Sequence, residues 1–303
     1  MIPLRQHVAS LVAVFLALAV GIALGGGPLA GGDDDNGGDQ STSIATEKPA
    51  PASDSQSEFA DAFAGAGAAR LYAAGLTGHA VAILAMPGAE TAQVKSLQAQ
   101  IVAAGGAITG TFTAGVKMVD AAERSLVDTT GSQLTAQLVD PRVETTAPTY
   151  ERMGQLLGIA MSTTQVSSVG ADLAAVSVRE SLSAAGLLTS PPDVRNAPLV
   201  LVVLPPGQEG AGASLATRTI LSGLAGGIRH NAAGVVVVGD QESAAGGELA
   251  ALRESELAVP ISTVDGIETT IGQVTAVLAL EAGIAGGTGS YGASGSDGVV
   301  PLG

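Results

Sequence analysis

The chain has 303 residues, of which 46% are hydrophobic and 14% charged, so it carries enough apolar material for a folded core. Its formal charge of -15 would repel a phosphate backbone, which argues against nucleic acid as a partner. It has no cysteine, which excludes disulfides, thiolate nucleophiles and cysteine metal sites. Aromatic residues make up only 2%, too few for the aromatic girdles of a porin-type barrel.

The amino-terminal segment is directed to a membrane. Residues 8–24 carry no charge, and Arg5 precedes them. A helix over this run would span about 25 Å, slightly less than the ~30 Å hydrocarbon core, but the run is longer than the apolar region of a typical signal peptide. We therefore predict a single-pass transmembrane anchor over residues 1–30, with a cleaved signal peptide as the alternative. Arg5 predicts that the amino terminus is cytoplasmic and that the rest of the chain is extracytoplasmic.

Residues 31–57 are rich in Gly, Asp, Ser, Thr, Pro and Ala. Such a segment has too little apolar surface to fold, so we predict a flexible acidic linker with a reach of about 30 Å. The main domain is predicted over residues 58–285. The Gly- and Ser-rich residues 286–303 are predicted to form a flexible tail.

Short apolar runs alternate with longer amphipathic patterns from about residue 72. This order predicts an α/β domain with a Rossmann-like, mainly parallel sheet flanked by helices. Both halves share the order strand, Pro-Gly turn, helix and strand, which fits an internal duplication but also ordinary α/β architecture. Residues 129–148 receive no assignment. The predicted strands are 79–85, 107–113, 199–204, 234–238 and 261–264, and the predicted helices are 91–104, 121–128, 150–161, 169–185, 214–229 and 270–285.

Two carboxylates stand where ligands bind in open α/β sheets. Asp240 and Asp265 each follow a predicted strand, and Gly207 and Gly210 lie in the loop after another. Because the carboxyl ends of parallel strands meet at one edge, these four residues could line one ligand-binding crevice. The alternative is that the two aspartates cap turns or the following helices.

Metal ligands are sparse beyond the amino-terminal segment. His79 and His230 are the candidates, and Met86 could join them if the two strand-helix units lie side by side. The alternative interpretation makes the methionines core residues and leaves the histidines on the surface or hydrogen-bonded.

No catalytic constellation is evident. None of the three lysines stands in a Gly-Lys-Ser/Thr sequence, and Gly-x-Ser-x-Gly does not occur. Residues 287–292 match Gly-x-Gly-x-x-Gly by letter but follow a predicted helix instead of a strand. We therefore assign no catalytic residue and no cofactor, and expect a protein that is not an enzyme.

Several segments resemble the mycobacterial copper transport protein B (MctB) family. They are Leu-Arg-Gln-His at 4–7, the apolar run at 14–19, Ala-Gly-Gly at 104–106, Leu-Leu-Gly-Ile at 156–159 and Ile-Ser-Thr-Val-Asp at 261–265. The resemblance covers both ends of the chain and recurs between them. These motifs are mostly structural, so they identify a family better than a mechanism.

The resemblance implies a role in copper efflux or copper homeostasis at an actinobacterial cell envelope, where family members are described as channel proteins. Copper is then the implied ion, and membrane lipid is the implied partner of the amino-terminal helix. The resemblance leaves open whether the protein forms a homo-oligomer. Family members carry a charged, coiled-coil-like helix after the membrane segment, and here the acidic linker stands in its place. The alternative is a tethered interaction or ligand-sensing module that does not itself transport copper.

Overall fold

The computed structural model describes residues 54–210, 212–255 and 260–301. The predicted anchor and residues 31–53 of the predicted linker lie outside the described residues. The chain divides into a unit up to Pro51 and a unit from Ala52 to Gly303, and all the described residues belong to the second. Among the described helices, none is both long and apolar enough to cross a membrane.

The domain is built on a sheet with the strand order β3-β2-β1-β4-β5-β6-β7. All neighbouring strands run parallel except β3, which is antiparallel to β2. β1, β4 and β5 are buried along their whole length, which is why they are continuous apolar runs in the sequence. The predicted α/β class and mainly parallel sheet are confirmed. The strands are β1 (Ala80–Ala85), β2 (Ala107–Ala114), β3 (Leu188–Thr189), β4 (Leu199–Val203), β5 (Gly234–Val238), β6 (Ser262–Val264) and β7 (Ser290–Tyr291).

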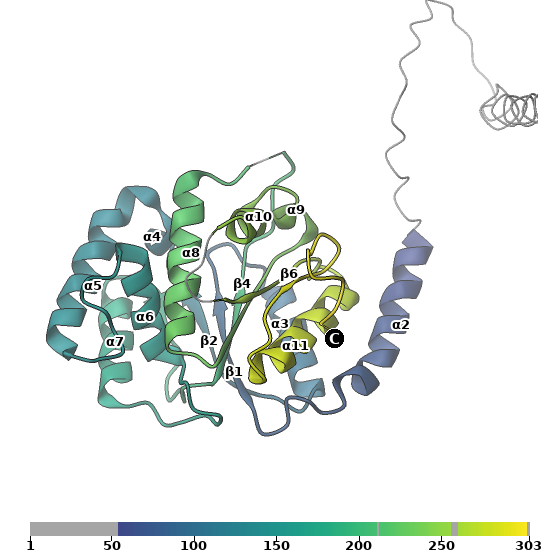
Figure 1. Ribbon diagram of the computed structural model, residues 1–303, viewed down its shortest axis with the longest axis horizontal. Helices are drawn as coiled ribbons and strands as arrows, with labels where there is room; N and C mark the ends of the chain where they lie inside the picture. Colours follow the sequence, from purple (N-terminus) through teal and green to yellow (C-terminus); the bar gives the residue numbers. More distant parts are fainter. Residues whose placement is uncertain (1–53, 211, 256–259, 302–303) are drawn as a thin grey trace, which may run out of the picture. The chain divides into compact units, whose positions relative to one another are not determined.

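Helices cover both faces of the sheet (Figure 1). On one face, α3 and α11 pack against alternate residues of β1, β4 and β5, and α2 packs on α11. The other face is thicker, because α6 is buried between α8, α5 and α7. The helices are α2 (Asp54–Tyr72), α3 (Thr91–Ala103), α4 (Val116–Val119), α5 (Arg124–Leu138), α6 (Thr149–Met161), α7 (Leu173–Ala184), α8 (Leu215–His230), α9 (Gln241–Ala244), α10 (Glu248–Arg253) and α11 (Thr270–Ile284), with the 3-10 turn η2 at Ala121–Glu123.

Glycines set the close approach of α6 and α8. A Cβ on Gly154 would overlap the carbonyl oxygen of Leu224 and lie 2.9 Å from the Cα of Gly227. Only residues without a side chain allow two backbones to come this near. This contact holds α8 against the buried helix and so fixes the layer above β4 and β5.

Several elements differ from the sequence prediction. α2 begins at Asp54, inside the predicted linker, and α5 extends through part of the unassigned stretch until Val139, which has φ 45°. α7 begins later than predicted, because the Asp172 side chain accepts a hydrogen bond from the Ala175 N–H and caps the helix. The composition of these segments gives no strong apolar periodicity, so their ends depend on caps and tertiary contacts.

The carboxyl-terminal segment is also ordered where a flexible tail was predicted. Ser290–Tyr291 forms β7 beside β6, and the Asp297 carboxylate accepts a hydrogen bond from the Ser290 N–H at 2.8 Å. Asp265 accepts two further backbone hydrogen bonds from this segment. The Gly- and Ser-rich composition does not reveal these contacts, because the Asp265 acceptors lie far away in sequence.

Candidate functional site

Asp240 and Gly207 meet at the carboxyl edge of the sheet, where Asp240 caps the following helix. Asp240 follows β5 and accepts the Ser243 N–H at 2.7 Å, which caps α9. Its two carboxylate oxygens also lie 3.0 Å from the Gly207 nitrogen, which donates to them from the loop after β4. A Cβ on residue 207 would overlap the backbone nitrogen of Ser243. Gly207 is therefore required for close packing of this loop on α9.

Gly210 does not join this contact. It is exposed in the same loop with φ +73°, and nothing lies within 4 Å of the position of its missing Cβ. Its position favours a turn that only glycine adopts easily. The loop therefore contributes Gly207, and not Gly210, to the edge of the sheet.

Asp265 is a buried anchor for the carboxyl-terminal segment. Its side chain is fully buried and accepts hydrogen bonds from the Ala293 N–H (2.6 Å), the Ser294 N–H (3.0 Å) and the Ser294 hydroxyl. Arg253 binds the same carboxylate at 2.9 Å and also donates to the Tyr291 carbonyl. Burial acts to raise the pKa of Asp265, but the bonds from Ser294 and Arg253 outweigh it and hold the pKa below its ordinary value. With these partners, Asp265 has little capacity left for a ligand.

Glu268 shares this neighbourhood. Its Oε1 lies 3.3 Å from the Gln241 nitrogen, which donates to it. Burial raises the pKa of Glu268, and repulsion from Asp240 and Asp265 adds to the effect. Even so, the residues that the structure describes contain no group of three or more His, Cys, Asp or Glu side chains arranged to hold a metal ion.

The predicted metal candidates do not converge with Met86. His79 precedes β1 and Met86 follows it, so the length of a six-residue strand, about 20 Å, separates them. The buried Nδ1 of His79 has no hydrogen-bond partner, and His230 is exposed at the end of α8. Met86, together with Met118, Met153 and Met161, lies in one hydrophobic core, as the core interpretation of the methionines predicted.

A small pocket lies beyond the carboxyl ends of the paired strands β1 and β4. It has a volume of about 70 Å³, and the loops after the two strands close on each other there, with a Cβ on Gly88 only 3.2 Å from Pro205. This is the position at which Rossmann-type folds bind dinucleotides, but the space is far too small for one. No sequence pattern predicted this pocket, because its walls come from segments that are distant in the sequence. Its lining residues are Met86, Pro87, Val119, Pro205, Thr217, Ile220, Leu221 and Glu248.

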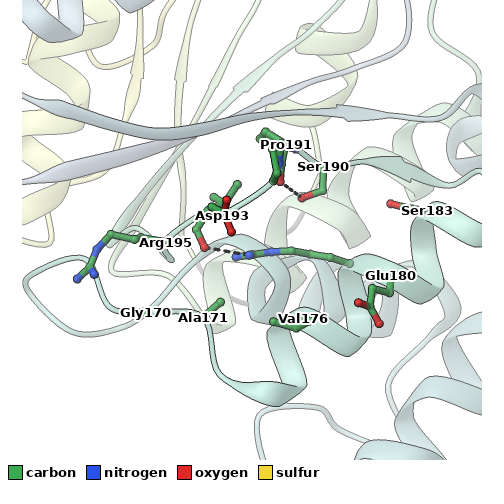
Figure 2. Close-up of a pocket in the computed structure, with 12 residues that line it drawn as sticks. Gly170, Ala171, Val176, Glu180, Ser183, Ser190, Pro191, Asp193 and Arg195 are labelled. Atoms are coloured by element: carbon green, nitrogen blue, oxygen red, sulfur yellow. Dashed lines mark hydrogen bonds between the residues drawn. The ribbon is translucent and has the colours of Figure 1, made fainter.

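A larger pocket of about 660 Å³ lies between one face of α7 and the segment 190–195. Figure 2 shows Ser190, Pro191 and Asp193 along one wall and Val176 and Glu180 along the other. Its volume is within the range of small-molecule sites. No sequence motif indicated it, because its walls meet only after α7 docks beside β3.

The base of this larger pocket is held by Arg179. The Arg179 guanidinium donates to the carbonyl of Ala160, to the carbonyl of Val194 at 2.9 Å and to Asn196 Oδ1 at 2.7 Å. Burial lowers the pKa of Arg179, with a smaller opposing effect from Asp172. These bonds tie α6, α7 and the segment before β4 together, so Arg179 has a structural role here.

Comparisons with known proteins agree across nearly the whole chain. Residues 1–301 match the family model described as copper transport outer membrane protein, MctB. The copper transporter MctB of Mycobacterium leprae is 30% identical over 324 residues, covering 96% of each chain. Those of Mycobacterium bovis and Mycobacterium tuberculosis are 32% identical over 330 residues, again covering 96% of each chain.

Proposed function

We propose a role in copper transport and copper homeostasis at the cell envelope for this chain, which belongs to the MctB family of copper transport outer membrane proteins. The observation that carries the proposal is the extent of the match. It covers residues 1–301 and 96% of relatives that are named copper transporters, so it includes both the amino-terminal apolar segment and the α/β domain. The family resemblance in the sequence motifs points the same way.

The proposed arrangement is a single-pass anchor at residues 1–30, a linker up to α2, and an extracytoplasmic α/β domain. The uncharged run at 8–24 and the preceding Arg5 support this topology. In this arrangement membrane lipid contacts the amino-terminal segment.

We also propose that the domain acts without enzymatic chemistry. Asp240 caps α9 and Asp265 is saturated by Arg253 and the carboxyl-terminal segment, so neither carboxylate is available as a general base or nucleophile. The narrow space beyond β1 and β4 is unsuited to a nucleotide cofactor. These features support a carrier or binding role for the domain.

The test is a deletion of the gene in its own host, followed by measurement of cellular copper and copper tolerance. We expect the deletion strain to accumulate copper, and the full chain but not a chain starting at Ala52 to restore the wild-type level. Cellular zinc serves as the control and should not change. Unchanged copper in the deletion strain would contradict the proposal and favour a tethered interaction or sensing module.

A further inference from the structure

The pocket of about 660 Å³ beside α7 has no part in the roles described above, and its size is that of a small-molecule site. One wall is a face of α7, where Val176, Glu180 and Ser183 stand four and three residues apart. The opposite wall is the segment 190–195, which follows the edge strand β3. Figure 2 shows the residues of the two walls facing each other across the pocket.

The wall formed by the segment 190–195 is rigid. Pro191 and Pro192 restrict its backbone, because each proline ring fixes φ. The segment also packs closely on the sheet, since a Cβ on Gly110 of β2 would lie 3.1 Å from Pro191 and 3.0 Å from Val194. The pocket is therefore formed before a ligand enters, as small-molecule sites usually are.

Arg179 lines this pocket and carries a buried positive charge. Among the described residues two arginines are buried, each 8% exposed. Arg152 pairs with Asp128 at 2.7 Å, whereas Arg179 belongs to none of the ion pairs in this part of the chain. Its hydrogen-bond acceptors, two backbone carbonyls and the Asn196 side-chain oxygen, are all neutral. A buried cation without a counter-charge is unfavourable, so an anion in the pocket would be stabilised.

The nearby carboxylates do not supply this counter-charge. Asp172 acts on Arg179 through its charge, but its carboxylate is bound to Arg142 at 2.8 Å. Glu180 and Asp193 line the pocket but are exposed to solvent, and neither forms an ion pair within the described ranges. The charge of Arg179 therefore stays uncompensated within the domain as described.

The Arg179 guanidinium also has hydrogen-bond donors to spare. A guanidinium carries five N–H groups, and the protein uses one on each of the three nitrogens. One N–H on each terminal nitrogen remains. The Phe112 ring lies 5.7 Å from the guanidinium carbon and covers one of its faces. A ligand anion can thus be bound through the two remaining N–H groups.

The rest of the lining determines the class of anion. Val176, which is 40% exposed, and Pro192 offer apolar surface to the body of a ligand. The exposed charges at the pocket are the carboxylates of Glu180 and Asp193 and the guanidinium of Arg195, which leave one net negative charge. This charge repels a doubly charged anion such as phosphate. A single carboxylate, by contrast, matches the single uncompensated charge of Arg179.

We propose that this pocket binds a small organic monocarboxylate with an apolar body, and that its carboxylate accepts hydrogen bonds from the two remaining N–H groups of Arg179. The apolar body lies between Val176 and the proline segment. This site is separate from the proposed copper role and does not depend on it.

The experiment is calorimetric titration of the purified full-length chain in lipid nanodiscs, with empty nanodiscs as the blank. The probes are benzoate and 3-phenylpropionate, each compared with its neutral primary amide, which has nearly the same shape but no charge. Val176→Trp fills the pocket from an exposed position of α7. Leu173→Trp is the matched control, because Leu173 is 89% exposed on the same helix and does not line the pocket. Arg179→Lys keeps the charge but loses the planar arrangement of donors. Urea unfolding checks that each variant is folded.

We expect at least one of the two carboxylates to bind with a Kd of about 1 mM or tighter, a value suited to ligands of this size. Its amide should bind at least about tenfold more weakly, because it cannot neutralise Arg179. Val176→Trp should weaken carboxylate binding at least about tenfold and Arg179→Lys about fivefold, whereas Leu173→Trp should stay within about twofold of the unmodified protein.

Three results would each overturn the proposal. They are the absence of binding by both carboxylates at 5 mM, roughly five times the expected Kd, equal binding of a carboxylate and its amide, and carboxylate binding that Val176→Trp leaves unchanged. Where Arg179→Lys does not fold, the amide comparison tests the charge and Val176→Trp tests the location. Copper tolerance of the deletion strain is independent of all three results, so failure of this site leaves the copper role in place.

Discussion

Replacing Asp265 with Asn should destabilise the domain without acting directly on copper binding. The carboxylate is fully buried and is bonded to Arg253 at 2.9 Å and to the N–H groups of Ala293 and Ser294. Asparagine leaves Arg253 without its counter-charge and can turn an N–H₂ group toward backbone donors. Breaking a buried ion pair in this way costs about 3–5 kcal/mol, and we expect about 3 kcal/mol because Arg253 keeps its bond to the Tyr291 carbonyl.

For a domain of this size, that loss corresponds to a decrease in Tm of about 6–12 °C. The assays are urea unfolding of the chain from Ala52 and amide hydrogen exchange, which should show faster exchange in residues 290–297. The pH dependence follows from the lowered pKa of Asp265. The stability that this carboxylate provides is present above its unfolded pKa, which is near 3.8, and is lost as pH falls through the lower folded value. The difference in stability between the unmodified protein and the Asp265→Asn variant should therefore become smaller in acid.

The control is Asp297→Asn, which alters an exposed carboxylate in the same segment that accepts the Ser290 N–H. It should cost less than about 1 kcal/mol. If Asp265→Asn changed stability by no more than the control and instead abolished Cu(I) binding, the reasoning would be refuted. Asp265 would then act in ligand binding, which was one of the two roles that the sequence pattern allowed for it.

Three further predictions concern other parts of the domain. Burial raises the pKa of Glu281 to about 7, so the folded state keeps a proton that the unfolded chain loses near pH 4.5, and stability should fall as pH rises from about 4.5 to 7. Glu281→Gln should remove this pH dependence and stabilise the protein by about 1–2 kcal/mol at pH 8 after allowance for solvent screening. An unchanged pH dependence of stability in urea unfolding would contradict this prediction. Gly207→Ala should cost about 1–3 kcal/mol because its Cβ overlaps Ser243, while Gly212→Ala, in open space, should be neutral in thermal unfolding. Arg179→Lys cannot reach the three acceptors and should cost about 2–4 kcal/mol; a loss under 0.5 kcal/mol would show that these bonds contribute little.

The central strands were predictable because of where they lie. β4 and β5 have helices on both faces, so every residue is buried and the sequence shows uninterrupted aliphatic runs. The position of Asp240 and Asp265 at the ends of β5 and β6 followed from the same pattern. Family membership was also apparent from sequence motifs near both ends of the chain.

α2 shows why other elements were missed. Ala64, Ala68 and Tyr72 are buried, while Phe59 and Phe63 on the opposite side of the helix are each 73% exposed. Apolar residues on two faces give no single apolar stripe, so the periodicity that indicates a helix is absent. Tertiary contact with α11 fixes the position of this helix instead. The Thr270 N–H at the start of α11 donates a hydrogen bond of 2.9 Å to the Asp61 carboxylate in α2.

The sequence by itself determined the fold class, the family and the edge of the sheet at which polar groups gather, because burial and strand order leave direct patterns in residue type. Only the tertiary structure decided what those polar groups do. Whether a carboxylate is free or saturated depends on donors distant in sequence, such as Gly207 for Asp240 and Ser294 for Asp265. The larger pocket beside α7 arises for the same reason, since its walls come from segments that meet only when the sheet and its helices assemble.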